Sequence, residues 1–250
     1  MSSTDIDPDA LAKYSFNVWT FKLGEMVSLL IHLGDRLDLF TALAGLGPVD
    51  STDLAASTGL DERLLREWLL AMGAARILTV TDGSQFELPP EGAAVLADEA
   101  NSISFSLGAF RGGVESAVLD LIVDSFRTGI GITYQQQGPK AAAGLARMTG
   151  PFSRMTLTSK ILPGLEGVVD KLDAGATVLD VGCGGGVTAC IIAKTWPNSK
   201  VVGYDPSEIA IGNARAHAAE VGVDNAEFVC AGAGDVPAGS GFDLVLTFDC

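Results

Sequence analysis

The sequence has no long apolar run and no paired cysteine motif, and each absence excludes a class of protein. No uncharged apolar stretch approaches the roughly 18–20 residues that a membrane-spanning helix needs. The acidic N-terminus (MSSTDIDPD) lacks the basic region of a secretory signal. The cysteines, Cys183, Cys190, Cys230 and Cys250, show no CxxC or CxxH spacing. We therefore expect a cytoplasmic protein with reduced thiols and no metal site.

Basic residues are also scarce, with 16 Lys and Arg against 31 Asp and Glu and a net charge of −15. This balance argues against nucleic acid or an anionic membrane surface as a partner. The chain has only two histidines, His32 and His217, and we predict neither as a catalytic base. With 250 residues, 48% of them hydrophobic, the chain can form a substantial core and exceeds one typical domain.

The first 100 residues are predicted to form a helical and winged-helix domain. Apolar spacing predicts helices over 10–33, 35–44 and a short segment capped by Ser51, followed by a longer helix capped by Asp61. Two β-rich runs then surround an Asp82-Gly83 turn, which is a strong hairpin signal. This order of helices and hairpin is that of a winged helix.

A winged helix raises the alternative of a ligand-responsive DNA-binding regulator. Residues 35–100 hold four Lys and Arg against twelve Asp and Glu, whereas phosphate recognition needs an excess of basic side chains. We favour the alternative that one apolar helix face packs on a neighbouring subunit or on the rest of the chain, and we predict a homodimer through residues 10–100. That face comprises Leu64, Leu65, Trp68, Leu69 and Met72.

Residues 101–176 are predicted to be a mostly helical connector that covers the active-site cleft. VESAVLDLIVDSF is one helix, RTGIGITYQQQG is a loop or turn region, and helix continues around RMTLTSKILPGLEGVVDKL with a break at Pro163-Gly164. No catalytic constellation can be identified there from spacing.

From residue 177 to residue 250 the pattern changes to alternating strands and helices. Apolar, β-branched runs at 177–182, 200–204, 226–230 and 242–248 predict four strands, and the segments between the first three are helical. This alternation predicts an α/β domain with a parallel sheet and right-handed crossovers.

Acidic residues lie where ligands bind in such sheets, beyond the carboxyl ends of the strands. Asp180 lies near the end of the first strand, Asp205 ends the second, and Asp235 follows the third. Each carboxylate alone fits a turn or cap. All three beside a glycine loop favour a ligand site.

The glycine loop has the pattern Asp-x-Gly-x-Gly-x-Gly over residues 180–186. Glycine permits a positive φ and close approach of the backbone to a ligand. Val187 stands where a GxGxxG dinucleotide fingerprint requires its last glycine, which counts against a nicotinamide-dependent oxidoreductase. The absence of Gly-Lys-Ser/Thr excludes a P-loop.

The segments VLDVGCGGG, VVGYDPS, AGAGDVP and FDLVLTFDC resemble the first half of a class I S-adenosylmethionine (SAM)-dependent methyltransferase. Upstream, LGDRLDLFTAL, LAASTGLDERLLREWL and FRTGIGITY resemble a bacterial methyltransferase family with an N-terminal winged-helix domain. The resemblance implies a Rossmann-like fold, SAM as cofactor, S-adenosylhomocysteine (SAH) as product, and a small-molecule acceptor.

The resemblance also implies roles for individual residues. Asp180 would orient the glycine loop and help hold the methionine ammonium, directly or through water, and the loop glycines would line the methionyl and ribose side. Asp205 would accept both ribose hydroxyls. Asp235 would accept from the adenine amino group, with the Val236 backbone near the ring and Phe248 near the transferable methyl. The complete implied cofactor set is Asp180, Gly182, Cys183, Gly184, Gly186, Asp205, Pro206, Gly234, Asp235, Val236 and Phe248. Gly185 departs from the histidine that many relatives carry at that position of the loop.

A full class I methyltransferase sheet has seven strands, and only four are predicted here. We therefore expect the C-terminal half of this domain, with much of the acceptor pocket and any base, to lie beyond residue 250. The acceptor-side candidates within this chain are Tyr134, Met148, Phe152 and Met155, for each of which core packing is the competing interpretation.

Overall fold

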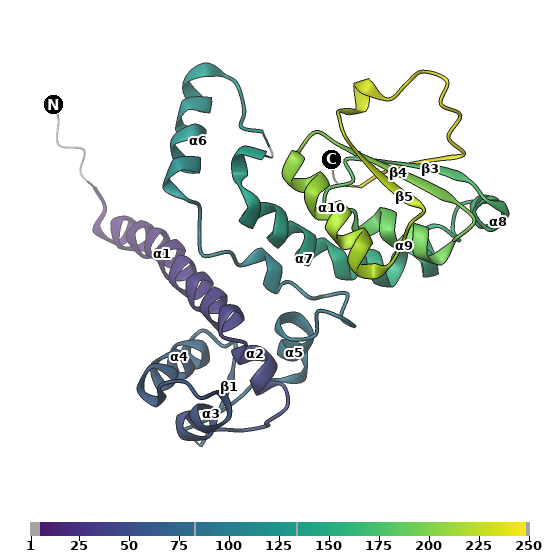
Figure 1. The fold of residues 1–250 in the computed structure, drawn as a ribbon. Coiled ribbons are helices and arrows are strands. Elements are labelled where there is room, and N and C mark those ends of the chain that lie inside the picture. The colour runs from purple at the N-terminus through teal and green to yellow at the C-terminus, as the bar shows by residue number, and fades with distance from the viewer. Residues whose placement is uncertain (1–5, 83, 134, 249–250) are drawn as a thin grey trace. The chain divides into compact units, whose positions relative to one another are not determined.

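The computed structural model describes residues 6–82, 84–133 and 135–248. The chain divides into two compact units, residues 1–98 and 99–250. Each unit is described by itself below, and Figure 1 gives the element labels.

The first unit consists of helices and a small hairpin. Its helices are α1 (Pro8–Arg36), α2 (Leu39–Leu43), α3 (Ser51–Thr58), α4 (Glu62–Ala74) and α5 (Pro90–Leu96), and its strands are β1 (Thr79–Thr81) and β2 (Gln85–Glu87). The strands pair antiparallel, and Val49 adds an isolated bridge to Phe86. The predicted winged-helix arrangement is therefore present.

The core of this unit is built around α4. Trp68 packs edge to face against Phe40, with ring centroids 5.4 Å apart, and its indole N–H donates to the Leu30 carbonyl at 2.9 Å. Leu65, Trp68, Leu69 and Met72 are all buried in the structure of the single chain, whereas Leu64 is exposed. Four of the five residues of the predicted α4 face thus pack within the chain itself.

Two local predictions for this unit were wrong, and one helix was not predicted. The helix expected from residue 35 begins only at Leu39, because Asp38 takes a left-handed φ of 54° and interrupts the chain after α1. Asp50, not Ser51, caps α3 by accepting from the amides of Thr52 and Asp53. Helix α5 was not predicted, since seven residues behind a Pro-Pro step show too little periodicity.

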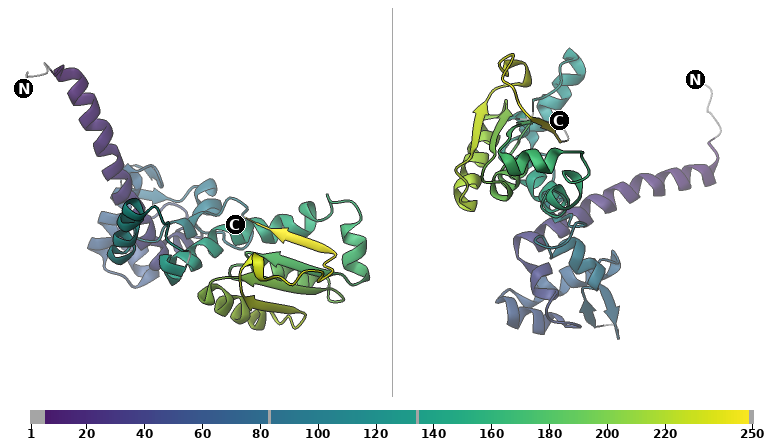
Figure 2. Two further views of the ribbon diagram at one scale, coloured as in Figure 1. Left: turned by 90° about the horizontal axis from the view of Figure 1, so that it is seen from above. Right: turned by 90° about the vertical axis from the view of Figure 1, so that its right-hand side faces the viewer.

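Helix α1 is much less buried than its apolar content suggests. Of its 29 residues only Ile31 and Gly34 are buried. Its predicted apolar positions, Leu11, Tyr14, Val18, Phe21, Met26, Leu29 and Leu33, are all between 40% and 73% exposed. Figure 2 shows the helix in two further views. No helix in the described part of the chain has both the length and the apolar character required to cross a membrane.

The second unit begins with helices. These are η1 (Leu107–Ala109), α6 (Ser116–Thr128), η2 (Gln135–Gln137), α7 (Pro139–Thr156), the π-helical turn η3 (Leu157–Ile161) and α8 (Val168–Ala174). Helix α7 starts earlier than predicted and continues through Pro151. The segment 162–167 forms turns between η3 and α8, where the break at Pro163-Gly164 was predicted.

The predicted parallel sheet follows. Strands β3 (Thr177–Val181), β4 (Lys200–Asp205), β5 (Ala226–Cys230) and β6 (Leu244–Thr247) are parallel and lie in the order β5-β4-β3-β6. Helices α9 (Val187–Thr195) and α10 (Glu208–Val221) connect them, and η4 (Ala233–Asp235) precedes β6. The predicted fourth strand is shorter at both ends than 242–248.

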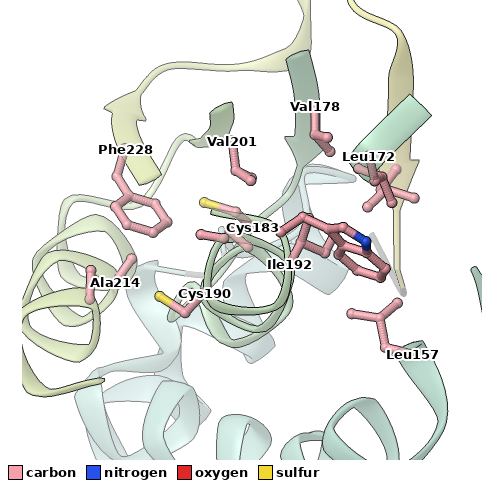
Figure 3. Packing of buried hydrophobic residues seen from close by; sticks show 14 of the residues in the cluster. Leu157, Leu172, Val178, Cys183, Cys190, Ile192, Val201, Ala214 and Phe228 are labelled. Atoms are coloured by element: carbon pink, nitrogen blue, oxygen red, sulfur yellow. The ribbon is translucent and has the colours of Figure 1, made fainter. Parts of the chain in front are cut away.

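A continuous core lies between the sheet and helices α9 and α10. Figure 3 shows Ile192 and Cys190 of α9 facing Val201 and Phe228 of the sheet. Leu157 and Leu172 extend the same cluster to η3 and α8. Because α9 is buried on this side, its N-terminus and the loop before it are held at the carboxyl ends of the strands.

Candidate cofactor-binding site

The glycine loop between β3 and α9 needs glycine at three positions. Gly182, Gly184 and Gly186 have φ values of 72°, 52° and 75°, a region that disfavours residues with a Cβ atom. The amides of Gly182 and Cys183 donate to the Tyr204 carbonyl of β4 at 2.8 and 3.0 Å. The loop is therefore fixed to the neighbouring strand.

Gly186 has a second, steric reason to be glycine. A Cβ atom there would lie 2.8 Å from the Ala214 side chain and 2.9 Å from the Phe228 ring. Gly186 is buried at the N-cap of α9 and does not line the cavity described below. In the structure Gly186 serves the packing of α9 against α10 and β5 and does not line the cavity. Its position in the motif alone did not distinguish these two roles.

Asp205, at the end of β4, holds two loops together. Its Oδ2 accepts from the Gly184 amide at 3.0 Å, and its Oδ1 accepts from the Ser207 amide at 2.8 Å. The residue is 8% exposed. A carboxylate oxygen has more than one acceptor site, so both oxygens can still receive a hydroxyl from a ligand.

Asp180, on β3 beside Asp205, has no such pair of amide contacts. It is 2% exposed, and its Oδ2 has no hydrogen-bond partner among the described residues. Burial raises the pKa of this carboxyl from 3.8 to about 7, the nearby Asp205 charge adds to the rise, and the Ala189 amide opposes it. Asp180 is thus a buried carboxyl group whose charge is only partly satisfied.

Asp180 and Asp205 line one cavity of about 570 Å³. Its floor includes the loop residues Gly182, Cys183, Gly184 and Gly185, with Val187 and Thr188 at the start of α9, Pro206 after β4, and Phe248 after β6. The structure therefore brings together seven predicted cofactor residues, Asp180, Gly182, Cys183, Gly184, Asp205, Pro206 and Phe248.

Helix α7 forms the opposite wall. Met148 and Phe152, two predicted acceptor-side residues, line the cavity together with Leu145, Ala146, Thr149 and Ser153. Met155, also on α7, does not line it, because the wall ends at Ser153 and the next turn enters the core through Leu157. Tyr134 lies outside the described residues.

The remaining predicted residues lie after β5. Asp235 is exposed, and its Oδ2 accepts from the Gly232 amide at 2.9 Å, so it closes the short turn of η4. Gly234, Asp235 and Val236 are absent from the cavity wall. The contacts of Asp235 in the structure are therefore those of a turn or cap residue.

The site has acidic and neutral groups but no cation. Among the described residues that line the cavity there is no Lys, Arg or His. Burial raises the pKa of the Cys183 thiol strongly and that of Cys190 to about 11, so both sulfurs stay protonated near neutral pH. His217 pairs with Glu220 on α10, 3.8 Å away.

The parallel sheet, its glycine loop and two strand-end carboxylates around one cavity define a Rossmann-like domain with a cofactor-type cleft. Comparison with known families identifies the domains. Residues 172–250 match the family described as a methyltransferase domain, and residues 25–98 match the Rv2258c-like winged HTH domain. The resemblance found in the sequence is confirmed for both segments: a winged-helix domain precedes a methyltransferase domain.

Individual relatives agree with this assignment. A ubiquinone biosynthesis O-methyltransferase of Rhizobium johnstonii is 41% identical over 75 residues, which are 30% of this chain and 29% of that protein. The structure of the mitomycin 7-O-methyltransferase MmcR superposes with a TM-score of 0.64 at 21% identity, covering 96% of this chain and 72% of that one.

Human N-acetylserotonin methyltransferase, solved in complex with SAM, gives a TM-score of 0.54 at 17% identity, covering 92% of this chain and 68% of that one. The matches to these two structures extend over both units, at an identity that indicates a common fold. The match to the Rhizobium enzyme, in contrast, spans less than a third of that enzyme's length.

Proposed function

We propose that the protein is a SAM-dependent methyltransferase that acts on a small-molecule acceptor. The observation that carries the proposal is the cavity in which the glycine loop, Asp180 and Asp205 face the largely apolar wall of α7. The matching methyltransferase domain and the SAM complex of the human structural neighbour support it.

The residues at the site fit this cofactor chemically. The unpartnered oxygen of Asp180 suits the ammonium of the methionine part, and the free acceptor sites of Asp205 suit the ribose hydroxyls. Bound SAM supplies an electrophilic methyl group on a sulfonium, whose thioether leaves without being protonated. An acidic cavity without a cation favours such a positively charged ligand.

The chain's own task is then to bind and align the reactants. The loop and the carboxylates fix the donor side, while Met148 and Phe152 on α7 and Phe248 after β6 exclude water and orient an acceptor. We propose that Gly234, Asp235 and Val236 contribute to the adenine side, and that segment 101–176 covers the cleft. Met155 and Tyr134 remain acceptor-side candidates on sequence grounds alone.

We infer that the protein is a cytoplasmic homodimer joined through residues 10–100. The exposed apolar side chains of α1 support this inference, since so many exposed apolar residues on one helix are typical of an interface.

Calorimetric titration with SAH, with NAD as comparator, tests the proposed function. We expect micromolar binding of SAH alone. Asp205→Ala should weaken it about 10- to 150-fold, or roughly 1.5–3 kcal/mol, because charge-assisted hydrogen bonds are lost. Asp243→Ala is the matched control, since Asp243 accepts the Thr177 amide at 2.9 Å at the other end of β3. Binding of NAD instead would favour an oxidoreductase, and equal SAH affinity in wild type and Asp205→Ala would refute the ribose assignment.

A further inference from the structure

The carboxyl group of Asp180 lies in a setting that disfavours a lone negative charge. It is almost fully buried, and one oxygen lacks any hydrogen-bond partner among the described residues. The neighbouring Asp205 carboxylate, also buried, repels a second negative charge at this position. Burial and a like charge both favour the protonated form of a carboxyl group.

The groups that face Asp180 do not compensate its charge with a cation. The glycine loop contributes the Cys183 thiol, α9 contributes the Cys190 thiol and the Ala189 amide, and β4 contributes Asp205. The described α7 side chains across the cavity are uncharged, and β6 places Leu246 beside Asp180. The Ala189 amide is therefore the favourable partner of an ionised Asp180, and it is a neutral one.

We propose that the binding of a ligand whose ammonium group enters this cavity expels a proton from Asp180. Below about pH 7 the carboxyl group is mostly protonated in the ligand-free protein, and it is ionised in the complex. Its O–H bond breaks, the electron pair stays on the carboxylate, and the proton passes to the solvent. The ammonium group of the ligand then takes the place of the proton as the positive partner. The inference rests on the proposed function, because SAM and SAH carry that ammonium group.

The size of the effect follows from the pKa of Asp180, which is raised to about 7. About nine in ten molecules then carry the proton at pH 6, and about half carry it at pH 7. If only the ionised form binds, the apparent Kd for SAH is about fivefold higher at pH 6 than at pH 7. The α-amino group of SAH stays mostly protonated over this range, since α-amino groups titrate at about 8 or higher.

The test is calorimetric titration with SAH in two buffers of different ionisation enthalpy, which counts the protons released. We expect nearly one proton per bound SAH at pH 6 and about half a proton at pH 7. Asp180→Asn should bind SAH without releasing a proton in this range. Asp243→Asn, at the opposite end of the same strand pair, should release protons like the wild type.

A second measurement does not depend on the ligand or on the variant. Carbon-13 NMR of aspartate carboxyl groups in the ligand-free wild type should show one resonance that titrates near pH 7. Its absence would overturn the inference. SAH binding without proton release would overturn the inference but leave the proposed function intact. Titration near 7 without any SAH binding would refute the proposed function and, with it, the coupling to this ligand.

Discussion

Asp180 and Asp205 are identical side chains at the ends of two adjacent strands, yet their surroundings differ. Asp205 accepts two backbone amides, whereas one oxygen of Asp180 accepts nothing among the described residues. Backbone amides stabilise the ionised form of a carboxylate, and burial without them destabilises it. The two carboxylates are therefore suited to different tasks, one fixing the loops and one responding to a ligand.

The raised pKa of Asp180 gives a prediction for the ligand-free protein. Because the folded state keeps this proton up to about pH 7 and the unfolded state loses it near 3.8, stability falls as the pH rises through this window. Asp180→Asn removes that fall. The variant should gain roughly 1–4 kcal/mol relative to wild type between pH 4 and pH 8.

Denaturant unfolding at both pH values measures this difference. Asp243→Asn serves as the control, because it replaces an exposed carboxylate on the same sheet. If the free energy of unfolding of Asp180→Asn differed from that of the wild type by the same amount at both pH values, the raised pKa of Asp180 would be contradicted.

The sequence predicted best those parts of the site whose residues lie close together in a recognisable motif or at the end of a predicted strand. The glycines form one motif and Asp205 ends one predicted strand, so the sequence alone predicts their place in the site. The cavity wall on α7 carries no motif: Leu145, Thr149 and Ser153 share a helix face, a pattern that equally describes a core-facing helix. Only the packing of α7 against α9 reveals that this face meets the glycine loop.

At the scale of elements, α7 is positioned by a close crossing with η1. A Cβ atom on Gly108 would lie 2.8 Å from the Gly144 carbonyl oxygen and 2.9 Å from the Met148 amide nitrogen. Arg147 adds an ion pair to Glu99 at 3.0 Å and lies over the Phe105 ring. The backbone contact between the two glycines therefore sets the place of the wall that carries Met148.

We predict that Gly108→Ala displaces α7 and weakens SAH binding several-fold. The added methyl group meets backbone atoms, which cannot rotate away, and such overpacking costs about 1–3 kcal/mol of stability. Titration with SAH and thermal unfolding together measure both effects. Gly131→Ala is the control, since a Cβ atom there meets nothing within 4 Å. Unchanged affinity in Gly108→Ala would show that the crossing does not position the wall.

The elements themselves were predictable wherever the signal was local. Asp61 caps α4, the turn at Asp82 joins β1 and β2, and all four parallel strands were located. The errors arose where tertiary context decides. Asp38 breaks the helical path in a left-handed conformation, and Pro151 is accommodated inside α7. A local propensity scale predicts neither outcome.

At the scale of the whole molecule, the exposed apolar side chains around α1 support a dimer. Trp19 and Phe21 are 66% and 73% exposed on a helix of which only two residues are buried. We predict that the wild type sediments as a dimer at micromolar concentration and that Phe21→Glu shifts it towards the monomer. Lys22→Glu, beside it on the same helix and 56% exposed, is the control. A wild-type monomer in analytical ultracentrifugation would contradict the inferred dimer.

The central claim is that a SAM-type cofactor binds between the glycine loop and α7. Hydrogen–deuterium exchange with and without SAH tests it directly, because bound ligand slows local opening. The account predicts increased protection in three segments, residues 180–188, 203–207 and 145–153, and none in the winged-helix segment 51–87. Protection confined to that winged-helix segment, or none anywhere at saturating SAH, would contradict the account.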